Sequence, residues 1–203
     1  MLEKIFHFPK KKINKKFDDS KDLHLSRDKI LAFLEKIRYE RPFILIDENI
    51  IVKKYSRFIN ALPNIRPFYA LKANSDKKII NILKSLKSGF EIASVKELDL
   101  LLDQNVSIKD IHYSNPIKSV EYIKYATDNG LEYFAFDCKE EMLKVFSLNN
   151  KAKLILRIDV PNTGSDWPLS DKFGAKKSDL KEILELFQNL YDKDYIYFHL
   201  HNF

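Results

Sequence analysis

The amino-acid sequence predicts an α/β fold in which parallel strands alternate with helices, and three observations favour it. Six short apolar segments have the length and composition of buried strands. Segments with helical periodicity and short connections separate them. The chain contains only 4 glycines, and no Gly-x-Gly-x-x-Gly pattern follows a strand segment, which excludes a dinucleotide-binding fingerprint. Of the two folds that regular alternation allows, a doubly wound sheet and a (β/α) barrel, the barrel is therefore preferred.

The chain begins with a basic segment, residues 1–25, that we expect to be a flexible arm. Its lysines contribute much of the formal net charge of +6. A basic arm can contact nucleic acid or an anionic surface, but no aromatic residues are interleaved with these lysines. A solvated arm is therefore preferred, and no nucleic-acid partner is expected. The clustered lysines are Lys10, Lys11, Lys12, Lys15 and Lys16.

Residues 26–65 are predicted to form a helix, a strand and a second helix that lead into the barrel. The first helix is expected over residues 26–39, because Ile30, Phe33 and Ile37 lie at helical spacing after the candidate cap Ser26. The apolar run 41–47 indicates a strand, and residues 48–62 a second helix.

The barrel is expected over residues 66–203, with about six of its eight strands present. The helix over residues 178–190 is the clearest, since Leu180, Ile183 and Phe187 share one face. The expected strands lie near residues 68–71, 90–93, 111–113, 133–136, 154–158 and 195–200.

The most informative residue is Lys72, which ends the apolar and aromatic run 66–74. Burying an unpaired ammonium is costly, so Lys72 either points into water or has a chemical role. Active sites of (β/α) barrels gather at the carboxyl ends of the strands. If the barrel forms, Lys72 lies at its mouth, where a partly desolvated amine can act as a nucleophile.

Four motifs in order carry a resemblance to a known family. The chain resembles the ornithine/diaminopimelate/arginine decarboxylase family over roughly residues 41–199, and within it most resembles ornithine or lysine/ornithine decarboxylase. Only the amino-terminal half is matched. The motifs are Phe-Tyr-Ala-Leu-Lys-Ala-Asn at 68–74, Ser-Gly-Phe-Glu-Ile-Ala-Ser at 88–94, Ile-His-Tyr-Ser-Asn-Pro-Ile-Lys at 111–118 and Phe-Ala-Phe-Asp at 134–137.

The resemblance implies an alanine-racemase-like TIM barrel that binds pyridoxal 5'-phosphate (PLP). It implies decarboxylation of a basic amino acid, L-ornithine to putrescine or L-lysine to cadaverine, in polyamine biosynthesis. Members of the family are homodimers, and the segment Lys172-Phe173-Gly174 matches one near the active-site mouth and the dimer interface. A racemase on the same barrel is less consistent with the lysine motif and with the residues after Gly89.

The resemblance also assigns roles to five residues. Lys72 would attach the cofactor, and Glu91 and Glu97 would lie near that lysine. Arg157 would lie near the cofactor's hydroxyl group, and His199 would stack on its pyridine ring. We expect Lys72, Glu91 and His199 to be catalytic, and Lys72, Glu97, Arg157 and His199 to bind the cofactor. From the residues alone, each glutamate can also be an exposed helix-start residue, and His199 a satisfied core histidine.

We expect the chain to be a truncated amino-terminal portion with little activity of its own. The Gly-rich phosphate loop, the later substrate-site residues and the β-domain of the family would follow residue 203. The alternative is a non-catalytic remnant or binding homologue that interacts with dimer partners. The choice between ornithine and lysine stays open.

Composition indicates a cytoplasmic protein. Cys138 is the only cysteine, so no intrachain disulfide can form. No apolar run has the length of a membrane span. The five histidines are scattered, so no metal site is expected.

Overall fold

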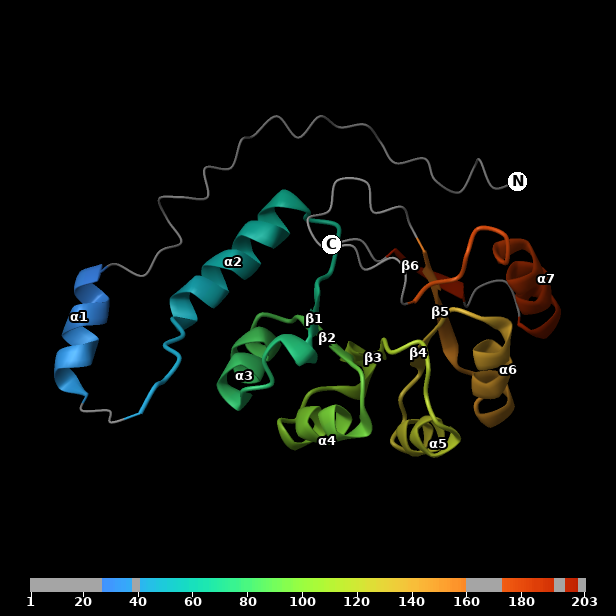
Figure 1. Ribbon diagram of the computed structural model, residues 1–203, viewed down its shortest axis with the longest axis horizontal. Helices are drawn as coiled ribbons and strands as arrows, with labels where there is room; N and C mark the ends of the chain where they lie inside the picture. The colour runs from blue at the N-terminus through green and yellow to red at the C-terminus, as the bar shows by residue number, and fades with distance from the viewer. Residues whose placement is uncertain (1–26, 38–40, 160–172, 192–195, 201–203) are drawn as a thin grey trace. The chain divides into compact units, whose positions relative to one another are not determined.

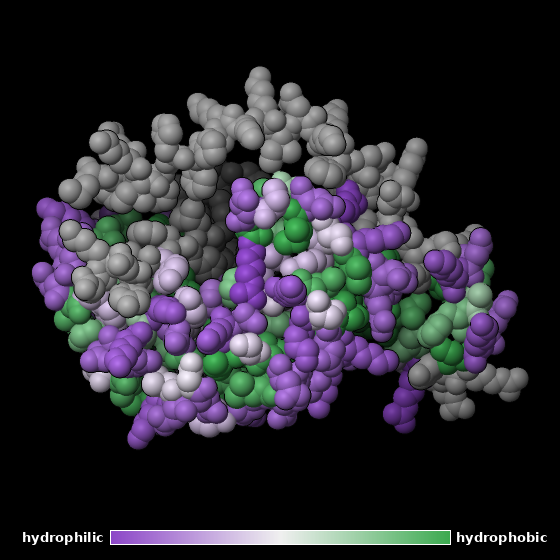
Figure 2. All heavy atoms as spheres, turned by 180° about the vertical axis from the view of Figure 1, so that it is seen from behind, coloured by the Kyte–Doolittle hydropathy of each residue, from purple (hydrophilic) through white to green (hydrophobic). Residues whose placement is uncertain are grey.

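The computed structural model describes residues 27–37, 41–159, 173–191 and 196–200 (Figure 1). The chain divides into two compact units, Met1–Lys54 and Tyr55–Phe203. The basic segment 1–25 lies outside the described residues. On the face that Figure 2 shows, hydrophilic side chains are interspersed with apolar ones. No helix in the described part of the chain has the length and hydropathy that a membrane crossing requires.

The segment that leads into the second unit contains two helices, α1 (Arg27–Lys36) and α2 (Glu48–Ala61). Residues 41–47, predicted to be a strand, are irregular. A strand persists when its backbone groups pair with a neighbour, and no described strand pairs with this segment. Ile44 is 89% exposed. The strand expected over residues 41–47 is therefore not formed among the described residues, and the helix-strand-helix division of residues 26–65 stays a prediction.

The second unit is built on one parallel sheet whose six strands pair in the order β1-β2-β3-β4-β5-β6. This order, with each strand beside the next strand in the chain, is that of a barrel wall and not of a doubly wound sheet. The predicted partial barrel with about six strands is confirmed. The strands are β1 (Phe68–Ala70), β2 (Gly89–Ile92), β3 (Ile111–Tyr113), β4 (Tyr133–Phe136), β5 (Lys153–Ile158) and β6 (Ile196–Leu200).

Five helices follow the first five strands in turn and cover one face of the sheet (Figure 1). Three of them begin at a side-chain cap, since Asp76, Ser94 and Ser119 each accept a backbone N–H of the first turn. The helices are α3 (Lys77–Ser85), α4 (Val95–Asp103), α5 (Val120–Asp128), α6 (Lys139–Leu148) and α7 (Leu180–Leu190). Two short 3-10 turns, η2 (Leu71–Ala73) and η3 (Ile108–Asp110), complete the connections.

The core lies between the sheet and these helices. Alternate strand residues such as Phe90 and Ile92 are fully buried there, because successive side chains of a strand point to opposite faces. The residue between them, Glu91, is only half-buried and belongs to the other face. The strand pattern therefore places apolar side chains under the helices and leaves the polar Glu91, together with aromatic rings, in the barrel interior.

Four aromatic rings from different strands form a row on this interior face. The Phe68 ring stacks on the His112 imidazole with centroids 3.9 Å apart, and His112 lies 4.5 Å from Tyr133. Tyr133 meets Tyr197 of β6 at 5.5 Å. Phe68 also covers Gly89, where an added Cβ would lie 2.3 Å from the ring. A glycine is therefore required beneath Phe68.

Replacement of Gly89 by alanine should destabilise the fold, because Phe68 would have to leave its position against His112. Overpacking of this kind costs about 1–3 kcal/mol, which urea unfolding would measure as a lower free energy of unfolding. In a Phe68→Leu background the added methyl group has more room. The losses of stability of the two single variants should therefore sum to more than the loss measured for the double variant. Strictly additive costs would contradict this account.

Candidate functional site

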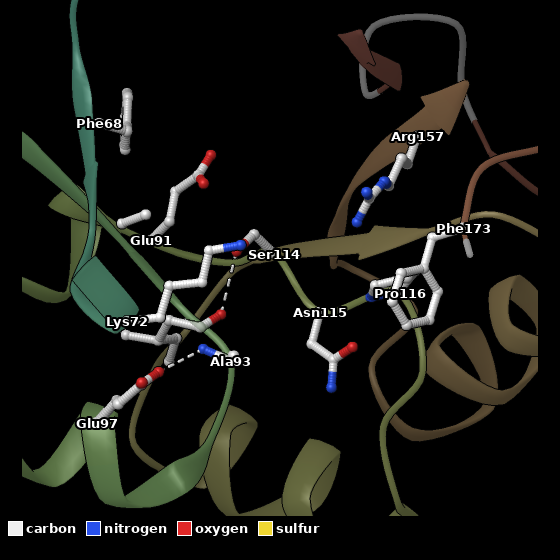
Figure 3. A pocket seen from close by; sticks show the side chains of 12 residues that line it. Phe68, Lys72, Glu91, Ala93, Glu97, Ser114, Asn115, Pro116, Arg157 and Phe173 are labelled. Carbon is white, nitrogen blue, oxygen red and sulfur yellow. Dashed lines mark hydrogen bonds between the residues drawn. The ribbon is translucent and has the colours of Figure 1, made fainter. Parts of the chain in front are cut away.

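A cavity of about 400 Å³ opens at the carboxyl ends of the strands, where the barrel pattern predicted an active site. Its lining comes from β1, η2, β2, the start of α4, the connection after β3, β5 and Phe173 (Figure 3). The residues that line it are Phe68, Ala70, Lys72, Glu91, Ile92, Ala93, Glu97, Ser114, Asn115, Pro116, Arg157 and Phe173. Four of the five residues singled out from the sequence therefore share this cavity.

Lys72 lies in η2, the 3-10 turn that directly follows β1. The preceding Leu71 is 1% exposed and anchors this turn in the core. The Lys72 side chain is exposed, yet Figure 3 shows its amine pointing into the cavity toward Glu91 and Ser114. Lys72 is thus both a solvent-accessible lysine and a lining residue of the cavity, and its chemical role stays a prediction.

Glu91 is held in the interior because its neighbours on β2, Phe90 and Ile92, are buried on the opposite face. Burial raises the pKa of the Glu91 carboxyl, and the nearby positive charges of Lys72 and Arg157 lower it by less. The desolvation of Glu91 therefore outweighs the attraction of two cations. A carboxyl group in such a setting can hold a proton closer to neutral pH than an exposed glutamate does.

Glu97 lies at the start of α4, at the edge of the cavity. Its Oε2 accepts the Ala93 N–H at 2.6 Å, and its own N–H donates to Ser94 Oγ at 3.3 Å. This arrangement closely resembles a capping box, in which a serine and a glutamate three residues later satisfy the free N–H groups of the first turn. The pattern Ser-x-x-Glu was present in the sequence and could have indicated this structural role.

Arg157 enters the cavity from β5 and lies over the Phe173 ring, with its guanidinium carbon 5.2 Å from the ring centroid. Burial lowers the pKa of Arg157, and the carboxylates of Asp137 and Glu91 counteract that effect. Its Nε is buried and has no hydrogen-bond partner among the described residues. A buried donor without an acceptor is costly, so this N–H is suited to an acceptor atom of a bound molecule.

The chain from Phe173 to Ala175 is fastened to the end of β5. The Ala175 N–H donates to the Arg157 carbonyl at 2.9 Å, and Ala175 accepts the Asp159 N–H at 3.1 Å. The Gly174 N–H donates to Asp137 Oδ2 at 3.0 Å. Gly174 has a φ of +117°, and a Cβ there would lie 2.6 Å from the Asp159 nitrogen. These contacts hold Phe173 against Arg157.

Sequence reasoning did not assign Asp137 to the site. Asp137 follows β4 directly, and its position at the carboxyl end of a barrel strand was a usable signal. For Phe173, the resemblance implied a place near the active-site mouth, but its contact with Arg157 depends on how the later segment returns to the sheet. The neighbouring Lys172 lies outside the described residues.

His199 is placed by its backbone alone. It lies on β6 in register with Arg157 of β5, so the two residues occupy equivalent positions on neighbouring strands. The described side chains do not include that of His199. In the part of the chain that the structure describes, no group of three or more His, Cys, Asp or Glu residues could hold a metal ion.

Comparison with known proteins identifies the family. Residues 48–198 match the family model described as pyridoxal-dependent decarboxylase, pyridoxal binding domain. The chain is 40% identical over 148 residues to antizyme inhibitor 2 of Xenopus laevis, covering 73% of this chain and 32% of that protein. It is 39% identical over 153 residues to ornithine decarboxylase of Caenorhabditis elegans, covering 75% and 36%. The chain thus spans about a third of the length of these curated relatives.

Solved structures support the same assignment. This chain superposes with a TM-score of 0.74 on the crystal structure of SrLDC in complex with PLP and cadaverine. The two sequences are 26% identical, and the match covers 89% of this chain and 44% of that one. Another structure on which this chain superposes is that of lysine decarboxylase from Selenomonas ruminantium. The expected family and the expected cofactor, pyridoxal phosphate, are confirmed. The chain belongs to the pyridoxal-dependent decarboxylases and contains their pyridoxal-binding domain over residues 48–198.

Proposed function

We propose that this chain is the cofactor-attachment portion of a PLP-dependent decarboxylase that acts on a basic amino acid. The observation that carries the proposal is the Lys72 amine, which points into a cavity shared with Glu91 and Arg157. A cavity of about 400 Å³ lies within the usual range for small-molecule sites and suits a single-ring cofactor.

The residues of the cavity fit the chemistry of this cofactor. Lys72 supplies an accessible amine to the aldehyde group, and the buried Nε of Arg157 supplies a donor to a ring oxygen. Glu97 borders the same space from α4. The resemblance implies that His199, on β6 beside Arg157 of β5, would stack on the ring. When bound, the cofactor supplies an electron sink for the carbanion that remains after loss of carbon dioxide.

Glu91 is assigned to proton transfer at Lys72 Nζ. Its carboxyl group lies close enough to Lys72 for the ammonium to affect its pKa, while burial raises that pKa. An acid with a pKa shifted toward neutrality can both receive and return a proton. Glu91 can also balance the positive charge of Lys72 when the amine is free.

The proposed substrate is L-ornithine or L-lysine, with putrescine or cadaverine as product in polyamine biosynthesis. Support comes from the relatives, which include an ornithine decarboxylase, and from a structural neighbour with bound cadaverine. We place the protein in the cytoplasm and expect it to work as a homodimer, as the family resemblance implies.

A second candidate is a non-catalytic role in which the partial barrel serves only as a binding surface. Antizyme inhibitor 2, 40% identical over the matched residues, is named for inhibition and not for decarboxylation. A chain of 203 residues that spans about a third of its relatives is compatible with either role.

Reduction with borohydride in the presence of PLP should label this chain at Lys72, because its amine is accessible at the mouth of the cavity. Peptide mapping by mass spectrometry would locate the label. The Lys72→Arg variant should lose it, whereas Lys77→Arg, which removes an exposed lysine of α3, should keep it. Equal labelling of many lysines would remove the support for an attachment site.

Assay of carbon dioxide release should separate the two candidate functions. The chain alone should release little from labelled ornithine or lysine, since the resemblance places other site residues outside it. Mixing it with the carboxy-terminal part of the Caenorhabditis elegans relative should produce release that Lys72→Arg abolishes. Selective labelling of Lys72 without any release in the mixture would favour the non-catalytic role.

Glu91→Gln should stabilise the chain at neutral pH, because glutamine imitates the protonated acid. The pKa of Glu91 in the folded chain is raised above its ordinary value of 4.5. Protonated Glu91 therefore contributes fully to the free energy of unfolding below pH 4.5, and this contribution is lost as the pH rises through the raised pKa. Urea unfolding at neutral pH and at about pH 4 would measure this difference, which should vanish in acid. The exposed Glu185→Gln serves as control, and a neutral-pH loss of stability for Glu91→Gln would refute the assignment.

A further inference from the structure

A buried ion pair lies beneath the connection from β3 to α5. Lys118 Nζ lies 2.8 Å from Glu141 Oε1 of α6, and the two side chains are 0% and 4% exposed. Lys118 is fully enclosed, although lysine is seldom buried in proteins. None of the site roles assigned above uses either residue.

The Lys118 ammonium also donates to backbone carbonyls. It bonds to the carbonyl of Asn115 at 3.0 Å and to that of Ala135 at 2.6 Å. The Pro116 carbonyl is a longer contact at 3.5 Å. Asn115 and Pro116 line the cavity, whereas Ala135 belongs to β4. One ammonium group therefore joins the cavity wall to the neighbouring strand.

Helix α6 holds the other end of the same connection. Glu141 Oε1 accepts the Lys118 N–H at 3.1 Å, and the Lys144 ammonium pairs with Glu141. Lys144 also donates to the Lys118 carbonyl at 2.6 Å. The wall segment 114–118 is thus fixed by side chains of an element more than 20 residues away in the sequence.

Stability alone does not account for this pair. Desolvation of two charges offsets much of their attraction, and a well-packed apolar pair of similar volume is often as stable. Burial lowers the pKa of Lys118, while its bond to Glu141 raises it. What an apolar pair cannot supply is a donor for the carbonyls of Asn115 and Ala135.

We propose that Lys118 is a positioning residue that sets the Ser114–Pro116 wall of the cofactor cavity, with Glu141 holding its ammonium in place. The proposal rests on the proposed function in one respect, because the wall matters for chemistry only if the cofactor binds there. A looser wall would leave the Lys72 amine accessible and would weaken retention of the cofactor.

The test compares two double variants of the full chain. Lys118→Met/Glu141→Leu removes the buried pair and keeps the volume roughly constant. Lys139→Met/Glu182→Leu removes an exposed pair with a 2.6 Å contact between α6 and α7, and is the matched control. Both variants and the unaltered chain are compared by thermal unfolding and by amide hydrogen exchange without cofactor.

The decisive amide is that of Ser114, which donates to the Ile92 carbonyl at 2.9 Å. Neither substitution touches this donor or its acceptor. Its exchange should accelerate about tenfold or more in the buried-pair variant and stay unchanged in the control. Unchanged exchange, or equal acceleration at Ser114 and at the core amides of Phe90 and Leu156, overturns the proposal, since the second result indicates general destabilisation.

A second readout connects the wall to the cofactor. The PLP concentration needed for half-maximal borohydride labelling of Lys72 should rise about tenfold in the buried-pair variant. An unchanged concentration overturns the positioning role. Absence of labelling in the unaltered chain would instead overturn the proposed function, and the Ser114 exchange rate would still decide whether Lys118 holds the wall.

Discussion

The site depends on one geometric constraint, the parallel pairing of six strands in chain order. Parallel strands end at the same rim, so residues separated by many positions in the sequence meet there. Lys72 follows β1, Glu91 lies on β2, and Arg157 lies on β5. Alternation along each strand then directs apolar side chains under the helices and leaves polar ones in the interior. No local motif could bring these three groups together without the sheet.

The charged groups at this rim lower the stability of the folded chain. Glu91 is desolvated enough that its pKa rises despite two nearby cations, and Arg157 carries a buried Nε without a partner among the described residues. Such features reduce stability and are common where a ligand completes the interactions. The Arg157 guanidinium lies over the Phe173 ring, and the Asp137 carboxylate, which raises the pKa of Arg157, accepts the N–H of the neighbouring Gly174.

The sequence of this domain is similar to relatives with different names, an ornithine decarboxylase and an antizyme inhibitor. Similarity of this kind does not identify the activity, which depends on particular side chains. In this chain the accessible amine of Lys72 shares its cavity with Glu91 and Arg157. The buried Lys118 adds a separate element, a charged tie between the cavity wall and the sheet that apolar packing would not reproduce.

The sequence by itself determined the α/β class, the six strands and the position of Lys72 at a strand end, because these follow from local periodicity and from a motif of neighbouring residues. It could not decide residues 41–47, which are irregular in this structure, since an apolar run becomes a strand only beside a partner. It also left the capping role of Glu97 unrecognised. Tertiary structure alone decided that Phe173 lies against Arg157 and that Lys118 bonds to Ala135. The first contact joins residues 16 positions apart and the second joins residues 17 positions apart. Each contact links two different parts of the fold, so its geometry depends on how the helices and loops return to the sheet.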